Sequence, residues 1–303
     1  MQFGWTANET TSLKVLDAAF EAGVNFIDTA NMYSRWVDGN PGGVSEQILG
    51  TWFEQNPGLR ERVILATKVR GPMGEGPLDQ GLSRKHILTA VRASLERMRT
   101  TYIDLYQLHY PDEETPIEET LDALTGLIRT GLVHNIGCSN FTASQLVEAL
   151  NTSERTGRAR FVSLQPHYNL IHRAEYEREL RSVCERYDLG VMPYSPLGRG
   201  FLTGKYKREG TQQSSGKPVS GRIKRYLQDQ SKTAVLEAVA SVAAESEASP
   251  SQVSLAWLLA QKTVTSVIIG PRTVEQLKDN LGALRTNLST GDLESLSEKS
   301  DWS

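Results

Sequence analysis

The feature that most constrains the fold of this 303-residue chain is a regular alternation between two kinds of segment. Short apolar runs rich in β-branched residues are separated by longer stretches in which apolar residues recur every three or four positions. The first pattern is typical of buried strands and the second of amphipathic helices, and together they predict βα units and a parallel sheet. Seven strands are expected, at 25–30, 63–69, 103–109, 134–139, 161–166, 190–195 and 265–270.

The segments between these runs have the faces and the starts of helices. In 84–98 and in 176–187, apolar side chains recur at helical spacing and define one apolar side. Three helix starts carry an N-cap residue followed three positions later by Gln, whose side chain is able to return to the cap. These N-caps are Thr142, Ser249 and Thr273.

Seven strands and one further strand at the N-terminus would complete a (β/α)8 TIM barrel. The segment 1–5 lies where that first strand should end, so we expect the first strand to be truncated and an upstream extension to increase stability. The alternative is a doubly wound open sheet, which usually carries a glycine-rich phosphate turn after its first strand. Neither GxGxxG nor GxxxxGK[ST] occurs, so the α/β barrel is favoured.

Domain organisation is expected to be simple. No Pro/Gly-rich linker divides the chain, which predicts a single domain over residues 1–303. Residues 205–230 are polar, contain Gly and Ser and lack apolar periodicity, so a long surface loop is expected there, in a position to act as a lid.

Charge and composition exclude several classes of partner. The net charge of −3 provides no basic field to attract nucleic acid or an anionic membrane surface. No apolar run approaches the length of about 18 residues that spans a bilayer. The two cysteines, Cys138 and Cys184, are too few for a disulfide framework, which fits a reducing compartment. We therefore expect a cytoplasmic protein; the sequence does not indicate its oligomeric state.

Polar residues stand where the first predicted strands end, which in a parallel barrel is where the active site lies. Asp28, Lys68 and His109 fall at or near three strand ends, and Tyr33 follows in the loop after Asp28. A buried Lys ammonium beside a Tyr hydroxyl lowers the pKa of the phenol, and an Asp beside the Lys keeps it charged. Such a tyrosine is suited to donating a proton, and the imidazole of His109 to hydrogen-bonding a substrate oxygen.

Several stretches in this order resemble the signature segments of the aldo-keto reductase family, and the resemblance covers nearly the whole chain. They are FIDTANMY, ILATKV, IDLYQLHY, GCSNF, SLQPHYNL, YSPLGRGFLTGKY and VIIGPRTVEQLKDN. The resemblance implies a barrel in which Asp28, Tyr33, Lys68 and His109 form a catalytic tetrad. It also implies reduction of a small aldehyde or ketone by NADP(H), with Tyr33 as the proton donor.

The resemblance further implies where the cofactor binds. Ser139, Asn140 and Gln165 are expected to hydrogen-bond the nicotinamide carboxamide, and the Tyr194 ring to stack on the nicotinamide. Ser195 and Leu197 are expected to contact the pyrophosphate and its surroundings. The 2′-phosphate is assigned to Arg272, which precedes a helix N-terminus and favours NADP over NAD, and the adenosine to Gln276 and Asn280. Trp5, Tyr110 and the 205–230 loop are expected to line the substrate site.

Other interpretations of the same residues stay open at this stage. Asp28 and Lys68 also fit a structural ion pair, Arg272 a solvated surface charge and Gln276 a capping box. A second function class is an NADP-binding regulatory or sensor subunit of the same fold with little turnover. A metal-dependent hydrolase would need strand-end ligand sets such as HxH, which are missing, so no metal site is predicted.

Overall fold

The computed structural model describes residues 1–76, 79–206 and 220–302. The chain divides into two compact units, which are described separately. Unit 1 comprises residues 1–165, 186–190 and 270–277, and unit 2 comprises 166–185, 191–269 and 278–303.

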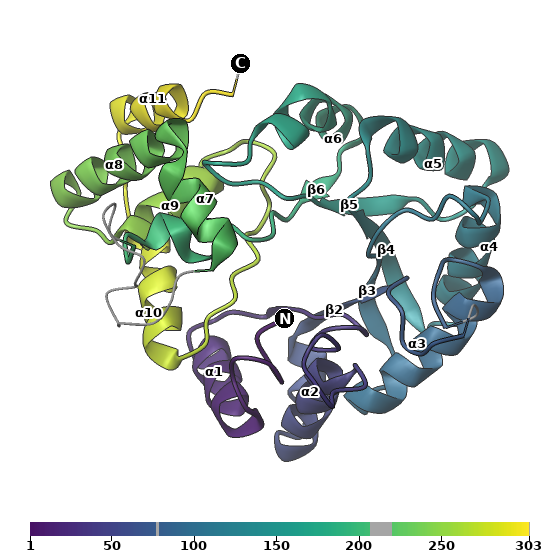
Figure 1. Ribbon diagram of the computed structural model, residues 1–303. Helices are drawn as coiled ribbons and strands as arrows, with labels where there is room; N and C mark the ends of the chain where they lie inside the picture. Colours follow the sequence, from purple (N-terminus) through teal and green to yellow (C-terminus); the bar gives the residue numbers. More distant parts are fainter. Residues whose placement is uncertain (77–78, 207–219, 303) are drawn as a thin grey trace. The chain divides into compact units, whose positions relative to one another are not determined.

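A parallel sheet organises unit 1. Its strands follow one another in sequence order, and the pairs from β1 to β5 are all parallel (Figure 1). The register pairs Lys68 with Gln107 and Ser139 with Gln165, so polar residues of neighbouring strands lie side by side near their carboxyl ends. The strands are β1 (Phe26–Asp28), β2 (Ile64–Val69), β3 (Ile103–Leu108), β4 (Val133–Ser139), β5 (Phe161–Gln165) and β6 (Gly190–Val191).

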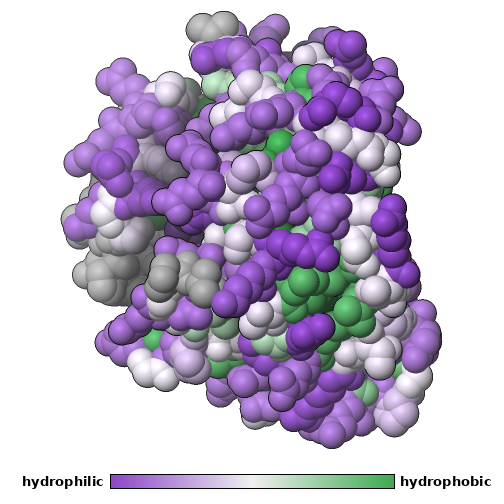
Figure 2. Space-filling model, turned by 90° about the vertical axis from the view of Figure 1, so that its right-hand side faces the viewer, coloured by the Kyte–Doolittle hydropathy of each residue, from purple (hydrophilic) through white to green (hydrophobic). Residues whose placement is uncertain are grey.

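Helices lie along the outer side of this sheet, as the amphipathic segments predict (Figure 1). They are α1 (Glu9–Glu21), α2 (Val44–Gln55), α3 (Arg84–Met98), α4 (Ile117–Arg129) and α5 (Ala143–Thr156), with a short 3₁₀ turn η1 (Arg60–Arg62). Ile87 and Leu121 on their inner faces are fully buried. The face that carries α3 to α5 is mostly hydrophilic, with a hydrophobic area near its middle (Figure 2).

One buried ion pair ties two of these helices to the sheet. Glu46 of α2 is fully buried, and its carboxylate accepts hydrogen bonds from Arg97 Nε of α3 at 2.7 Å and from Thr67 Oγ1 of β2 at 2.6 Å. Both carboxylate oxygens are therefore satisfied, which is the condition under which a buried charge is tolerated.

Unit 2 is mainly helical. Trp257 is fully buried against Tyr168, with ring centroids 5.7 Å apart, and its Nε1 donates to Ser297 Oγ at 3.0 Å. The helical elements of this part of the chain, some of which run into unit 1, are η2 (Tyr176–Leu180, a π-helix), α6 (Arg181–Tyr187), η3 (Gly198–Thr203), α7 (Gly221–Gln228), α8 (Gln230–Glu245), α9 (Pro250–Leu259), α10 (Val274–Gly282), η4 (Ala283–Arg285) and α11 (Thr290–Lys299).

The prediction of an eight-stranded barrel is confirmed in part: the described residues form a parallel sheet of six strands. The strand predicted at 265–270 is not formed. Thr265 N donates to Val191 O at 2.9 Å and Ile268 N to Pro193 O at 3.0 Å, but these bonds do not extend into a continuous ladder. Pro193 lacks an N–H, which also explains why the strand predicted at 190–195 ends at Val191. Before α1 the chain forms only an isolated bridge between Phe3 and Ala7.

The prediction of a long loop at 205–230 was wrong for its C-terminal part. Residues Gly221–Gln228 form α7, capped by the Ser220 side chain, with Ile223 buried. Ile223, Tyr226 and Leu227 recur there at helical spacing, a signal that sequence reasoning missed. Residues 207–219 lie outside the described part of the chain.

In the described part of the chain, no helix is both long and apolar enough to span a membrane.

Candidate active site

The ammonium group of Lys68 is the centre of the site in unit 1. Lys68 lies near the end of β2 and is fully buried. Its Nζ contacts Asp28 Oδ2 at 2.5 Å, Thr29 O at 2.9 Å and Tyr33 Oη at 3.0 Å. An ammonium has three protons, so each finds an oxygen, and the charge is held by Asp28 at the end of β1.

The second oxygen of Asp28 is also occupied. Gln107 Nε2 donates to Asp28 Oδ1 at 3.0 Å and Gln165 Nε2 donates to the same atom at 2.9 Å. Sequence reasoning missed Gln107, although a signal existed. It stands in β3 two residues before His109, and strand alternation places both on one face.

His109 follows β3 and lies beside Tyr33. Its backbone N–H donates to Val69 O at 2.9 Å, and its ring meets the Tyr33 ring edge to face, with centroids 5.7 Å apart. Burial first, and then the charge of Lys68, lower the pKa of His109 to about 3. The imidazole is therefore neutral at physiological pH and offers one N–H donor and one acceptor.

Burial also decides the protonation of the Lys68–Tyr33 pair. Burial alone would lower the pKa of Lys68, but Asp28 and then Tyr33 raise it, so the ammonium is charged. Burial raises the pKa of Tyr33, and the opposing effect of Lys68 is smaller. The expected lowering of the Tyr33 pKa was therefore wrong, because desolvation of a fully buried phenol outweighs one nearby cation.

Three residues predicted to contact nicotinamide lie beside the tetrad. Ser139 Oγ donates to Gln165 O at 2.7 Å, and Asn140 Nδ2 donates to His109 O at 2.8 Å and to Ser139 Oγ at 3.0 Å. Asn140 adopts φ 61°, a conformation that Asn tolerates better than most residues. The structure thus brings Ser139, Asn140 and Gln165 together with the tetrad in unit 1.

Arg272 and Gln276 lie at the start of α10, and both are exposed. Gln276 N donates to Thr273 Oγ1 at 3.3 Å, while Gln276 Oε1 accepts from Arg272 N at 2.9 Å. The capping box predicted for Thr273 is therefore displaced by one residue, because the Gln276 side chain reaches past the cap. No hydrogen bond joins Arg272 or Gln276 to the tetrad within the described part of unit 1.

The remaining predicted cofactor residues belong to unit 2. The Tyr194 ring stacks on His167 with centroids 5.1 Å apart and an angle of 8°. Ser195 adopts φ 54°, and its carbonyl accepts from Gly198 N at 3.0 Å in the turn that leads through Leu197 into η3. Asn280 of α10 is buried.

The two predicted substrate residues are exposed aromatic side chains of unit 1. Trp5 is 46% and Tyr110 43% exposed, and the Tyr110 ring stacks on His109 at 4.8 Å. Trp36, which sequence reasoning missed, connects Trp5 to the tetrad. Its ring lies 5.6 Å from that of Trp5 and 6.3 Å from that of Tyr33, both approximately edge to face.

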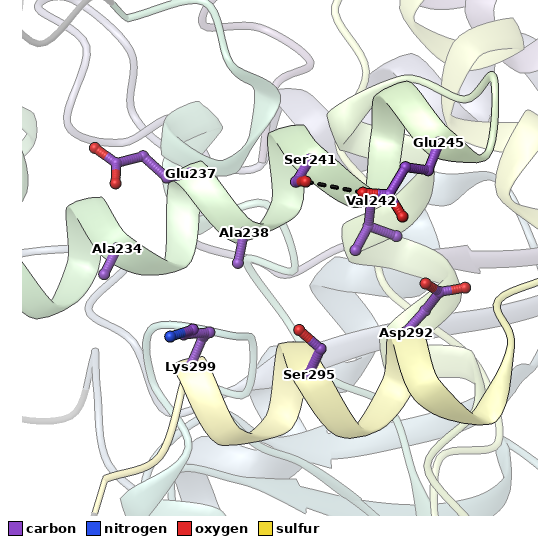
Figure 3. Close-up of a pocket in the computed structure, with 9 residues that line it drawn as sticks. All are labelled: Ala234, Glu237, Ala238, Ser241, Val242, Glu245, Asp292, Ser295 and Lys299. Carbon is purple, nitrogen blue, oxygen red and sulfur yellow. Dashed lines mark hydrogen bonds between the residues drawn. The ribbon is translucent and has the colours of Figure 1, made fainter.

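A cavity of about 470 Å³ lies elsewhere, between α8 and α11 of unit 2, and side chains of both helices line it (Figure 3). Its lining includes Glu237, Glu245, Asp292 and Lys299, and none of the residues predicted to act in catalysis or cofactor binding. Within the described ranges, no cluster of three or more His, Cys, Asp or Glu side chains is arranged to hold a metal ion.

Comparison with known proteins identifies relatives over nearly the full length. A family model described as the aldo/keto reductase family matches residues 1–301. The uncharacterized oxidoreductase YrpG of Bacillus subtilis is 37% identical over 292 residues, which are 95% of this chain and 86% of that protein. Versiconal hemiacetal acetate reductase of Aspergillus parasiticus is 31% identical, over 97% of this chain and 88% of that one. A probable voltage-gated potassium channel subunit beta of Oryza sativa is 33% identical, over 93% and 84% respectively.

Proposed function

This chain belongs to the aldo/keto reductase family, a family of oxidoreductases, and from that premise we propose that it reduces an aldehyde or ketone to the alcohol with NADPH. The observation that carries the proposal is the chain of contacts from Asp28 through Lys68 Nζ to Tyr33 Oη, at 2.5 Å and 3.0 Å. In this chain of contacts the hydroxyl of Tyr33, whose pKa burial raises, lies beside the ammonium of Lys68 at the carboxyl ends of the strands.

The protein's part in the reaction follows from these protonation states. Tyr33 holds its proton at neutral pH because burial raises its pKa, and it donates that proton to the carbonyl oxygen as negative charge develops there. Lys68 then stabilises the phenolate that remains, and Asp28 keeps Lys68 charged. The neutral imidazole of His109 donates a hydrogen bond that orients the same oxygen.

NADPH, when bound, supplies the hydride for the carbonyl carbon. The hydroxyl of Ser139 and the carboxamides of Asn140 and Gln165 suit a carboxamide ligand, because they combine donors and acceptors. We assign Tyr194 to ring stacking on nicotinamide and the turn of Ser195 and Leu197 to the pyrophosphate.

The preference for NADPH over NADH is assigned to Arg272. The Arg272 side chain is exposed and makes no ion pair with the described residues. The residue stands just before the nine-residue helix α10. A guanidinium and a helix N-terminus together suit the 2′-phosphate. Gln276 and Asn280 are proposed to contact the adenosine.

The direct test is Tyr33→Phe, assayed by the loss of NADPH absorbance with a panel of simple aldehydes and ketones. We expect turnover to fall by about 10²-fold or more, because the proton donor is lost, while NADPH binding measured by fluorescence is retained. Tyr187→Phe removes a phenol that bonds Asn151 and serves as the matched control with wild-type turnover. Unchanged turnover in Tyr33→Phe would refute the assignment.

A second candidate is a cofactor-binding sensor with little turnover, which the potassium channel subunit among the relatives favours. Retention of all four tetrad residues does not separate the two functions. Tight NADPH binding by the wild type without reduction of any carbonyl in the panel would support the sensor and contradict the reductase.

A further inference from the structure

Polar atoms left without partners gather around the tetrad. Among the described residues, the buried side-chain atoms without a hydrogen bond include both polar atoms of Asn31, Arg70 Nε and His109 Nδ1. Buried polar groups in native proteins are nearly always hydrogen-bonded, so a local concentration of unbonded ones calls for an explanation. A ligand that supplies the missing partners is one such explanation.

Arg70 and His109 directly follow β2 and β3, and Asn31 lies three residues beyond the end of the neighbouring β1. Asn31 follows β1, and its backbone N–H donates to Lys68 O at 3.2 Å. Arg70 directly follows β2, whose last register pair is Val69 with Leu108. Because His109 N also donates to Val69 O at 2.9 Å, Arg70 leaves the sheet beside His109.

The backbone at Arg70 is held in a conformation that an arginine rarely adopts. Its φ is 113°, and its carbonyl accepts a hydrogen bond from Gly81 N at 3.0 Å, which anchors the loop. Strained residues of this kind concentrate at ligand sites, where the surrounding fold over-determines the geometry. The strain therefore adds to the case for a binding role of Arg70.

No carboxylate of the described residues neutralises Arg70. Asp28 is committed to Lys68 and to two glutamines. Asp112 Oδ2 accepts from Leu82 N at 2.7 Å, and Asp79 Oδ2 accepts from Gly76 N at 2.9 Å. The field of Arg70 also reaches His109, whose pKa is lowered by burial, then by Lys68, then by the N-terminal amino group of Met1, and last by Arg70. Among the described residues, the charge of the Arg70 guanidinium is thus uncompensated.

We propose that Arg70 binds a carboxylate of the substrate, so that the preferred substrates are aldehydes or ketones that also carry a carboxylate group. The inference rests on the proposed reductase function and names its substrate class. A guanidinium binds a carboxylate in bidentate fashion, and the Asn31 carboxamide adds a further donor. A single uncompensated cation matches a monoanion better than a phosphate ester, whose charge approaches −2.

The test compares two aldehydes of similar size, para-formylbenzoate and para-formylbenzamide, in wild type, Arg70→Met and Arg70→Lys. We expect Arg70→Met to lower kcat/KM for the acid at least 30-fold more than for the amide, through KM, and Arg70→Lys to lose less. Arg92→Met removes an exposed arginine of α3 and should leave both substrates unchanged. Thermal melts show whether the variants are folded.

A direct binding titration separates this inference from the reductase proposal. Benzoate is titrated against each variant by tryptophan fluorescence, and weaker binding to Arg70→Met than to wild type or Arg92→Met supports the inference even if no aldehyde is reduced. Equal benzoate binding by wild type and Arg70→Met overturns it, as does equal loss of kcat/KM for acid and amide. Absence of turnover in the wild type contradicts only the reductase function.

Discussion

At the scale of the residue, the charge of one buried ammonium organises its surroundings. Lys68 is fully buried, and its proton donors are directed at Asp28, Thr29 and Tyr33. Breaking a buried pair of this kind by removing one partner leaves an uncompensated charge, which typically costs about 3–5 kcal/mol of stability. Substitutions at Asp28 therefore need a measurement of folding beside any measurement of rate.

The buried histidine of the tetrad predicts how stability depends on pH. The pKa of His109 is lowered from 6.5 to about 3, so between these values the unfolded chain binds a proton that the folded chain does not. The stabilisation is complete above pH 6.5 and is lost as pH falls toward 3, by up to about 1.4 kcal/mol per pH unit. Urea unfolding at several pH values should show a shallower acid-side decline for His109→Gln than for wild type.

The matched control for this measurement is His134→Gln, because the side chain of His134 is about half exposed. We expect it to keep the wild-type decline. His167 and His172 also have a pKa lowered to about 4, chiefly by burial, so part of the decline should remain in His109→Gln. Identical curves for wild type and His109→Gln would mean that His109 does not contribute.

At the scale of the element, helix caps illustrate what short-range patterns determine. The capping boxes predicted at Thr142 and Ser249 are confirmed. A further box at Ser289 was not predicted, because Asp292 replaces the usual Gln or Glu. Its carboxylate accepts from Ser289 N at 2.8 Å, and Asp292 N donates to Ser289 Oγ at 3.1 Å.

The cap of α11 provides a prediction of stability. Ser289→Ala removes the acceptor for Asp292 N and should lower the free energy of unfolding by about 1 kcal/mol. Ser295→Ala makes the same chemical change at an exposed position of the same helix and should stay within about 0.5 kcal/mol of wild type. Chemical denaturation measures both, and equal losses would show that the hydroxyl of Ser289 does not cap the helix.

At the scale of the whole molecule, the proposed cofactor predicts a gain of stability on binding. A ligand that binds only the folded chain stabilises it by about 2.7 kcal/mol at a concentration 100 times its Kd. We therefore expect NADPH to raise the Tm more than NADH at equal concentration. Arg272→Gln should reduce the NADPH shift toward the NADH value, because the guanidinium proposed for the 2′-phosphate is lost.

Arg285→Gln is the control, since Arg285 is an exposed residue that follows α10 in the chain. It should keep the full difference between NADPH and NADH. A larger Tm shift with NADH than with NADPH in the wild type would contradict the assignment of Arg272.

Much of the architecture was predictable because local patterns carry it. The segment 84–98 is a helix with the predicted bounds, and five predicted strands are present within two residues at each end. Side-chain alternation and helical spacing are read from neighbours in the chain, so they need no knowledge of the fold. The same local patterns predict that the tetrad residues lie close together, because Asp28, Lys68 and His109 stand at the ends of adjacent parallel strands.

Only the tertiary structure decided what surrounds those residues. Gln165 reaches Asp28 from 137 positions away, and no local pattern contains that contact. Packing of distant segments also decided three other features. These are the raised pKa of Tyr33, the unbonded side-chain atoms of Arg70 and Asn31, and the absence of a strand at 265–270. The sequence by itself determined most of the helices and strands and which chemical groups stand at their ends. Burial and pairing depend on distant segments that pack around each group, so the electrostatics of the site were decided by the fold.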